Sequence, residues 1–275
     1  MKRRGAAYMV AVCAVMTALL IAVQYALGFA AGVELVTVFL LAFCYVFGAA
    51  YGVLTATAFS LLRCFLWGFY PNVVVLYLIY YNAFALLFGM LGKRGKPVAG
   101  WVCPALLALL GAGCAVCAAV GLPVSVLYKA RLTAMFWALF GVLAGLLAAY
   151  IIVLCVGRAR AAVWREAASL AALAALCSVC FTLLDDVLTP LFYGYTFDAA
   201  VAYFYTGFFA MLPQTMCAAV SVFVLFAPLR KAFSAARGRE VACRRRFRRE
   251  QSARKRRREG ENAASNDGRT QKDVV

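Results

Sequence analysis

The chain has 275 residues, 66% of them hydrophobic, and a formal net charge of +17. A soluble domain is usually about 45–50% apolar, so this composition excludes an ordinary soluble fold and predicts a polytopic membrane protein. The chain has no histidine, which excludes histidine metal ligands and Ser-His hydrolase pairs. The 11 cysteines lie mostly in apolar runs, and the two CxxC pairs, at 114/117 and 177/180, are interpreted as packing residues.

Eight apolar blocks follow one another along the chain, and each is predicted to form a helix. The predicted fold is therefore all-α, a transmembrane bundle of about eight helices. The second and third blocks are short or marginal for a span of about 20 residues. The eighth is long and contains two prolines, so it is predicted to be broken or preceded by an interfacial segment. The blocks cover residues 7–29, 34–47, 49–67, 73–91, 98–120, 132–156, 167–191 and 199–229.

Basic residues predict how the bundle is oriented in the plasma membrane, because lysine and arginine favour cytoplasmic loops. Residues 2–4 place the N-terminus in the cytoplasm, and eight spans place the basic loops after blocks four, six and eight on the same side. Both termini are therefore predicted to be cytoplasmic. Lys129 and Arg131 are exceptions, because this scheme assigns them to an outer loop.

The C-terminal segment, 233–275, is predicted to be a disordered basic tail, separate from a transmembrane domain at 1–232. From residue 230 onward the chain has 16 basic and 6 acidic residues, and its arginine runs repel one another and supply no core. Because the segment follows the last apolar block, anionic lipid is its predicted partner and nucleic acid is not.

Polar residues inside or beside the apolar blocks predict a ligand pocket, because such groups are costly in hydrocarbon and tend to face a cavity. Most lie toward the predicted outer ends of the helices, Asn72 lies in an outer loop, and Asn82 and Gln214 lie nearer the middle. The alternative is that helix ends tolerate charge and that Arg63 pairs with an acid. Aromatic residues nearby could cover a flat ligand or form an interfacial belt. The candidate substrate-binding residues are Glu34, Thr37, Arg63, Asn72, Asn82, Asp185, Asp186 and Gln214.

A stripe of small residues in the first block predicts a docking face for a partner helix. Ala14, Ala18 and Ala22 recur every four residues, which places them on one face where another helix can approach closely. The alternative is packing within the bundle.

Catalytic motifs are missing from the sequence. It contains no GxxxxGK[ST] and no GxGxxG that opens a helix after a strand, and the pair Asp185-Asp186 has no second carboxylate cluster for a two-metal site. We therefore expect no catalytic residues, metal or cofactor.

Several motifs together resemble the substrate-binding (S) components of energy-coupling factor transporters. They are Gly-Val-Glu-Leu-Val-Thr at 32–37, Phe-Gly at 47–48, Trp-Gly-Phe at 67–69, Gly-Met-Leu-Gly-Lys-Arg at 89–94, Leu-Leu-Asp-Asp at 183–186, Leu-Pro-Gln at 212–214 and Ala-Pro-Leu-Arg-Lys at 227–231. The resemblance covers roughly residues 7–91 and 180–231, and implies a six-helix core with blocks five and six as an added pair.

The resemblance implies a function as well. The chain would be the capture subunit of a vitamin or micronutrient importer, binding its small-molecule substrate on the outside. It would then associate with a transmembrane coupling subunit and two ATPase subunits, and the alanine stripe would be the face for the coupling subunit. Two alternatives remain open: a self-sufficient secondary transporter, which needs repeats or broken midplane helices, and an intramembrane enzyme, which needs a nucleophile–base or metal constellation.

Overall fold

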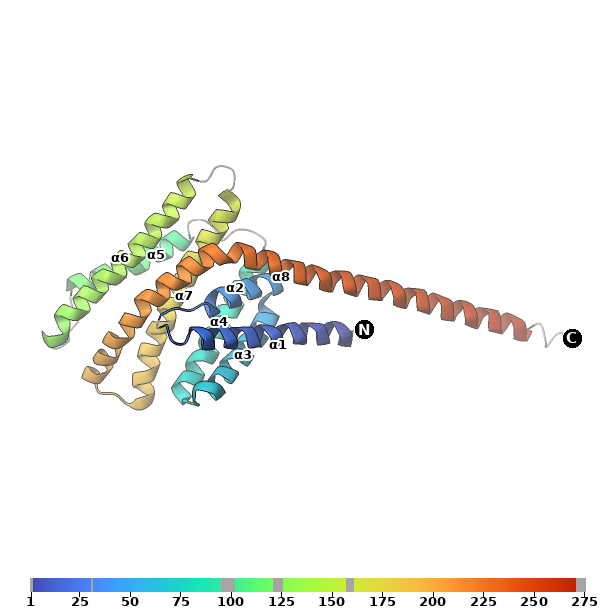
Figure 1. The fold of residues 1–275 in the computed structure, drawn as a ribbon, viewed down its shortest axis with the longest axis horizontal. Coiled ribbons are helices and arrows are strands. Elements are labelled where there is room, and N and C mark those ends of the chain that lie inside the picture. Colours follow the sequence, from blue (N-terminus) through green and yellow to red (C-terminus); the bar gives the residue numbers. More distant parts are fainter. Residues whose placement is uncertain (1, 31, 95–101, 121–125, 157–160, 271–275) are drawn as a thin grey trace.

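The computed structural model describes residues 2–30, 32–94, 102–120, 126–156 and 161–270. Within these ranges the chain forms eight helices and no strand, which confirms the predicted all-α class (Figure 1). The helices are α1 (Lys2–Leu27), α2 (Val36–Phe47), α3 (Ala49–Trp67), α4 (Pro71–Arg94), α5 (Val102–Val120), α6 (Val126–Val156), α7 (Ala161–Tyr193) and α8 (Phe197–Thr270).

Six helices of the described chain, α1, α3, α4, α6, α7 and α8, are long and apolar enough to cross a membrane by length and composition. The chain is therefore compatible with a multi-pass membrane protein. Helix α2 has 12 residues and rises only about 18 Å, well short of a hydrocarbon core of about 30 Å. The apolar part of α5, Pro104–Val120, is also shorter than the other six. The expectation of eight spans is thus reduced to six candidate spans.

Two local expectations are wrong. Lys129 and Arg131 lie in the first turns of α6 rather than in a loop. The guanidinium of Arg131 is placed over the ring of Tyr205 in α8, with 5.8 Å between Cζ and the ring centroid. Long basic side chains can extend from a helix end along apolar surface in this way, so a charge does not require the helix to stop.

The second wrong expectation is that the prolines break the helix of the eighth block. Helix α8 continues through both Pro213 and Pro228, although it bends as it leaves the bundle (Figure 1). A proline removes one backbone hydrogen bond, and within a packed bundle neighbouring groups and small adjustments compensate for that loss.

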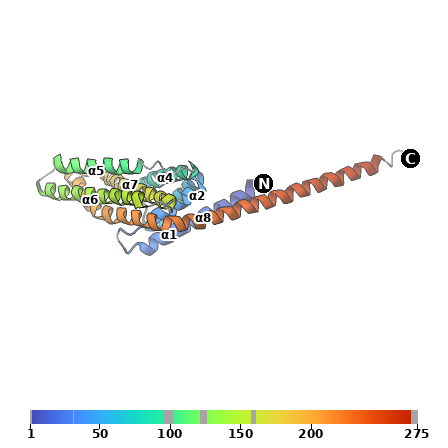
Figure 2. The same cartoon turned by 90° about the horizontal axis from the view of Figure 1, so that it is seen from above.

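The basic tail follows without a break in the helix. Phe233 and Ala236 pack against the bundle core, and Arg237 donates a hydrogen bond to the carbonyl oxygen of Val46, so bundle packing extends beyond residue 232. Farther on, the helical backbone projects away from the bundle as far as Thr270. The beginning of α1 and the distal part of α8 extend from the same side of the bundle (Figures 1 and 2).

The core has two clusters of buried side chains that share the α7–α8 hairpin. The larger joins α1, α2, α3 and α4 to α7 and α8. The smaller joins α5 and α6 to the same two helices. No described residue of α5 or α6 belongs to the larger cluster, so this pair packs on one side of a bundle built from the other six helices.

Candidate functional site

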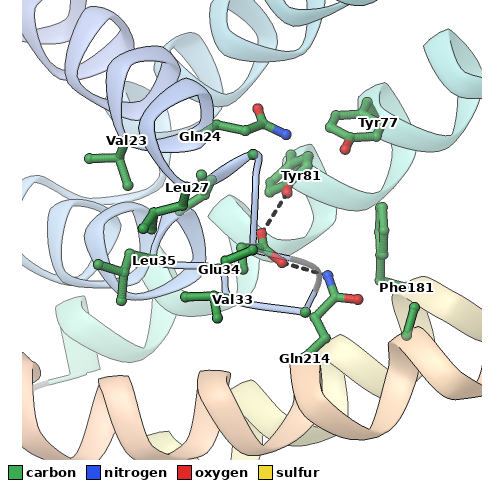
Figure 3. A pocket seen from close by; sticks show the side chains of 15 residues that line it. Val23, Gln24, Leu27, Val33, Glu34, Leu35, Tyr77, Tyr81, Phe181 and Gln214 are labelled. Carbon is green, nitrogen blue, oxygen red and sulfur yellow. Dashed lines mark hydrogen bonds between the residues drawn. The ribbon is translucent and has the colours of Figure 1, made fainter.

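A cavity of about 250 Å³ lies where the end of α1 and the α1–α2 loop meet α4, α7 and α8 (Figure 3). This is about eight times the roughly 30 Å³ that one molecule occupies in liquid water. Its wall is part aliphatic, with polar groups from α1, the loop and α8 and rings from α4 and α7. The polar and aromatic lining residues are Gln24, Glu34, Tyr77, Tyr81, Phe181 and Gln214.

The α1–α2 loop is held tightly against α8. Gly32 has a φ of +81°, a conformation that favours glycine, and a Cβ there would lie 2.7 Å from the ring of Pro213. The Glu34 amide donates to Cys217 Sγ at 3.4 Å, and this thiol donates to the Glu34 carbonyl oxygen at 3.4 Å. These contacts fix the backbone from which the Glu34 side chain enters the cavity.

The Glu34 carboxylate collects hydrogen bonds from three other side chains. Its Oε2 accepts from Gln214 Nε2 at 2.5 Å, and its Oε1 accepts from the Tyr81 hydroxyl at 3.1 Å (Figure 3). Thr37 Oγ1 also donates to Oε1 at 3.4 Å. Hydrogen bonds to a carboxylate are charge-assisted, so the cavity contains a well-supported negative group. Glu34 and Gln214 are 180 positions apart in the chain, and the fold brings them together.

Gln24 adds an acceptor that has no partner. Its Oε1 is buried and makes no hydrogen bond within the described chain. In Figure 3 the side chain extends from α1 toward Tyr77 across the cavity. Sequence reasoning omitted Gln24 from the site, although the cost of a buried amide in an apolar helix applies to it as much as to Gln214.

The aromatic wall was also missed by sequence reasoning. Tyr77 and Tyr81 are one helical turn apart on α4, and both pack against Phe181 of α7, with ring centroids 5.6 Å and 6.2 Å from it. The spacing of the two tyrosines was a usable signal, because residues four apart lie on the same helix face. Phe181 offers no such signal, since nothing in its local sequence distinguishes it from other apolar residues of α7.

Arg63 does not line the cavity. Its guanidinium lies on the ring of Tyr77, with 4.1 Å between Cζ and the centroid, and its Nε is buried without a hydrogen-bond partner in the described chain. The expectation that Arg63 pairs with an acid is not met there. The ion pair within 4 Å that the described residues form joins Glu166 of α7 to Arg230 of α8, at 2.5 Å.

A second polar group, which we call the Asp185 cluster, joins the start of α4 to α7 and α8. It consists of Asn72, Asp185, Thr189, Tyr193 and Tyr203. Asp185 accepts from Thr189 at 2.8 Å and from Tyr203 at 3.0 Å. Asn72 donates to Thr189 at 3.0 Å and accepts from Tyr193 at 3.2 Å. Asn72 thus lies buried in the first turn of α4, not in a loop as expected, and the cluster's groups satisfy one another.

Asp186 and Asn82 lie apart from the lining of the cavity. Asp186 is 8% exposed, and both of its carboxylate oxygens lack a hydrogen-bond partner within the described chain. A Cβ on Gly207 would lie 2.5 Å from Asp186 Oδ1, so this glycine lets the carboxylate pack against α8. Asn82 accepts a hydrogen bond from Thr57 of α3 at 2.9 Å. The ligand roles predicted for these two residues stay predictions.

The alanine stripe faces outward. Ala14, Ala18 and Ala22 are exposed on α1, whereas Met16 and Leu20 on the opposite face belong to the core. No helix of the described chain covers the stripe.

Within the described ranges, no group of three or more cysteine or acidic side chains is arranged to hold a metal ion. Comparison of the chain with protein-family models, with curated proteins and with solved structures gave no match.

Proposed function

We propose that the chain is the substrate-capture subunit of an ATP-driven importer of a vitamin or related micronutrient, of the energy-coupling factor type. The observation that carries this proposal is the cavity between the α1–α2 loop and the bundle. It combines a supported carboxylate, two amides and three aromatic rings in a chain that is otherwise largely apolar. Small-molecule sites have this composition, a mostly apolar wall with a few convergent polar groups.

The orientation expected from the basic residues suits capture from outside. The basic start of α1 and the basic end of α8 extend from one side of the bundle, as two termini on the same side of a membrane would. With that side in the cytoplasm, the chain lies in the plasma membrane with its α1–α2 loop outside. The loop that carries Glu34 then meets the external medium.

The outward face of α1 suits a helix of a coupling subunit. The exposed alanines let another backbone approach closely, and ATP hydrolysis would come from partner subunits, since the sequence lacks a P-loop. We expect Ala18→Leu to lower co-purification with a coupling subunit while leaving ligand binding intact. The matched control is Ala83→Leu, a change at an exposed alanine of α4. Equal co-purification of both variants removes the stripe from the proposal.

The test of capture is mass spectrometry of the small molecule that co-purifies with the protein in detergent. Gln214→Ala is expected to lower the affinity for that molecule about tenfold to a hundredfold, because it removes a lining group and a donor to Glu34. Asn82→Ala removes an amide that does not line the cavity, so it should leave the affinity unchanged if the cavity alone binds the molecule, and should lower it if the ligand role predicted for Asn82 holds. Equal affinity in Gln214→Ala and wild type contradicts the assignment of the cavity.

One observation favours a second candidate, a self-sufficient secondary transporter. Asp186 is a buried carboxylate in a candidate span and has no hydrogen-bond partner among the described residues, and ionisable residues in such positions mark ion or proton pathways. Proteoliposomes that contain this chain alone separate the two candidates. Uptake driven by a proton or sodium gradient, without ATP and without partners, favours the transporter over the capture subunit.

A further inference from the structure

The charge of the cavity restricts what it can hold. Glu34 is the one charged residue among the described residues that line it. The nearby guanidinium of Arg63 lies on the Tyr77 ring and is not part of the lining. Since a low-dielectric surrounding strengthens electrostatic interactions, a ligand group that touches the Glu34 carboxylate is favoured when it is positive and disfavoured when it is negative.

The hydrogen-bonding groups restrict the ligand further. The Nε2 of Gln214 and the hydroxyl of Tyr81 already donate to Glu34. A carboxylate offers about four acceptor positions, and the three donors that reach Glu34 leave one open. The Oε1 of Gln24 is buried without a hydrogen-bond partner in the described chain, and a turn of this lining side chain would present it to the cavity as a second acceptor. Both positions accept hydrogen bonds, so a ligand that contacts them presents N–H or O–H donors.

The walls and the volume of the cavity restrict the ligand further. Tyr77, Tyr81 and Phe181 form a contiguous aromatic wall against which a flat group can pack. Arg63 occupies one face of the Tyr77 ring, so a positive charge of the ligand is attracted to the remaining ring faces. A volume of about 250 Å³ accommodates a single ring or a small bicyclic system rather than a large cofactor. Planarity, positive charge and hydrogen-bond donors together define one chemical class.

We infer that the cavity binds a planar organic cation with N–H donors, such as an amidinium or a protonated aminoheterocycle, through Glu34, Gln24 and the aromatic wall. This inference rests on the proposed capture function and names the class of substrate.

The test uses three probes of one shape and three charges: benzamidine as its cation, neutral benzamide and anionic benzoate. Calorimetric titration of the full chain in detergent is expected to give affinities in that order, with benzamidine at least about tenfold tighter than benzamide. In Glu34→Gln the ratio is expected to fall to within about threefold, whereas Asp185→Asn retains it. If Glu34→Gln does not fold, Gln24→Leu decides, because it removes the second open acceptor and is expected to weaken benzamidine about tenfold.

Three results overturn the inference: benzoate binding as tightly as benzamidine, a preference for the cation that survives both substitutions, and no binding by any of the three probes. These failures are distinct from failure of the proposed function. A co-purified anion that the cell imports with partner subunits overturns the cation assignment and leaves the importer standing. Cation binding without any partner-dependent uptake supports the cation assignment and overturns the proposed importer.

Discussion

Two polar regions of the same bundle use their hydrogen-bonding groups in opposite ways. In the Asp185 cluster, Thr189 and Tyr203 donate to both oxygens of one aspartate, and the groups close on one another. Around Glu34 the carboxylate is equally well supported, but a cavity remains beside it, and the Gln24 side chain that lines this cavity has a carbonyl oxygen without a partner in the described chain. A polar group in an apolar chain therefore has two solutions, mutual pairing or a cavity, and only the second leaves room for a ligand.

The largest effect is expected where the loop of the cavity packs against α8. Gly32→Ala introduces both an unfavourable backbone conformation and a contact of 2.7 Å with Pro213, and should lower the free energy of unfolding by about 2–4 kcal/mol. The same change should weaken ligand binding, because it displaces Glu34. Thermal unfolding and ligand titration in detergent measure the two effects.

A matched control for this prediction lies in the α7–α8 turn. Gly194 has a φ of +62°, but a Cβ there would meet nothing within 4 Å. Gly194→Ala should therefore lower the free energy of unfolding by only about 1–2 kcal/mol, from the backbone alone, and leave ligand binding unchanged. Equal losses in the two variants mean that the contact between Gly32 and Pro213 is unimportant.

Disrupting the Asp185 cluster should lower the stability of the protein without weakening ligand binding. Asp185→Ala removes the acceptor for Thr189 and Tyr203, and should lower the free energy of unfolding by about 1–2 kcal/mol, the range found for hydrogen bonds between membrane helices. Ligand affinity should stay within about threefold of wild type. A loss of affinity without a loss of stability would assign the Asp185 cluster to the binding site.

Replacement of the neighbouring aspartate, Asp186, should raise the free energy of unfolding instead of lowering it. Asp186 is buried against Gly207 without a partner in the described chain, so Asp186→Asn removes a poorly compensated charge and should raise the free energy of unfolding by about 1 kcal/mol. Asp185→Asn, the matched change one position earlier, should lower it. Destabilisation by Asp186→Asn shows instead that the carboxylate has an essential partner, such as a bound cation.

The smallest effect on stability is expected at Tyr193, at the edge of the Asp185 cluster. Tyr193→Phe removes one hydrogen bond to Asn72 and should lower the free energy of unfolding by about 0.5 kcal/mol. Tyr195→Phe changes the ring that stacks on Tyr193 and should have no measurable effect. A larger loss in Tyr195→Phe than in Tyr193→Phe contradicts the hydrogen-bond assignment.

The sequence predicts the fold class well because apolar blocks of this length have few alternatives to membrane helices. It predicts the ends of α3 correctly, since Gly48 and Gly68 bound the helix and both have a positive φ. It fails where tertiary packing overrides a local rule: α8 continues through Pro213, and α6 begins before Lys129.

The candidate site was predicted only in part, for a physical reason. The cost of polar groups in hydrocarbon selects Glu34 and Gln214, but selects Asp185 and Asn72 just as strongly. Whether such a group faces a cavity or another side chain depends on helix packing between distant segments, which one sequence does not specify. Asp185 accepts hydrogen bonds from Thr189 and Tyr203, which lie four and 18 positions away from it in the chain. No sequence pattern at either residue predicts this contact.

The contrast between the two regions is tested most directly by equilibrium dialysis of the co-purified molecule against wild type and two matched acid-to-amide variants. Glu34→Gln should bind the molecule at least about tenfold more weakly than wild type, while Asp185→Asn should bind it within about threefold. Melting temperatures of the three proteins establish that all are folded. Undiminished binding by Glu34→Gln, or a greater loss in Asp185→Asn, contradicts the claim that the Glu34 cavity is the ligand site and the Asp185 cluster a structural one.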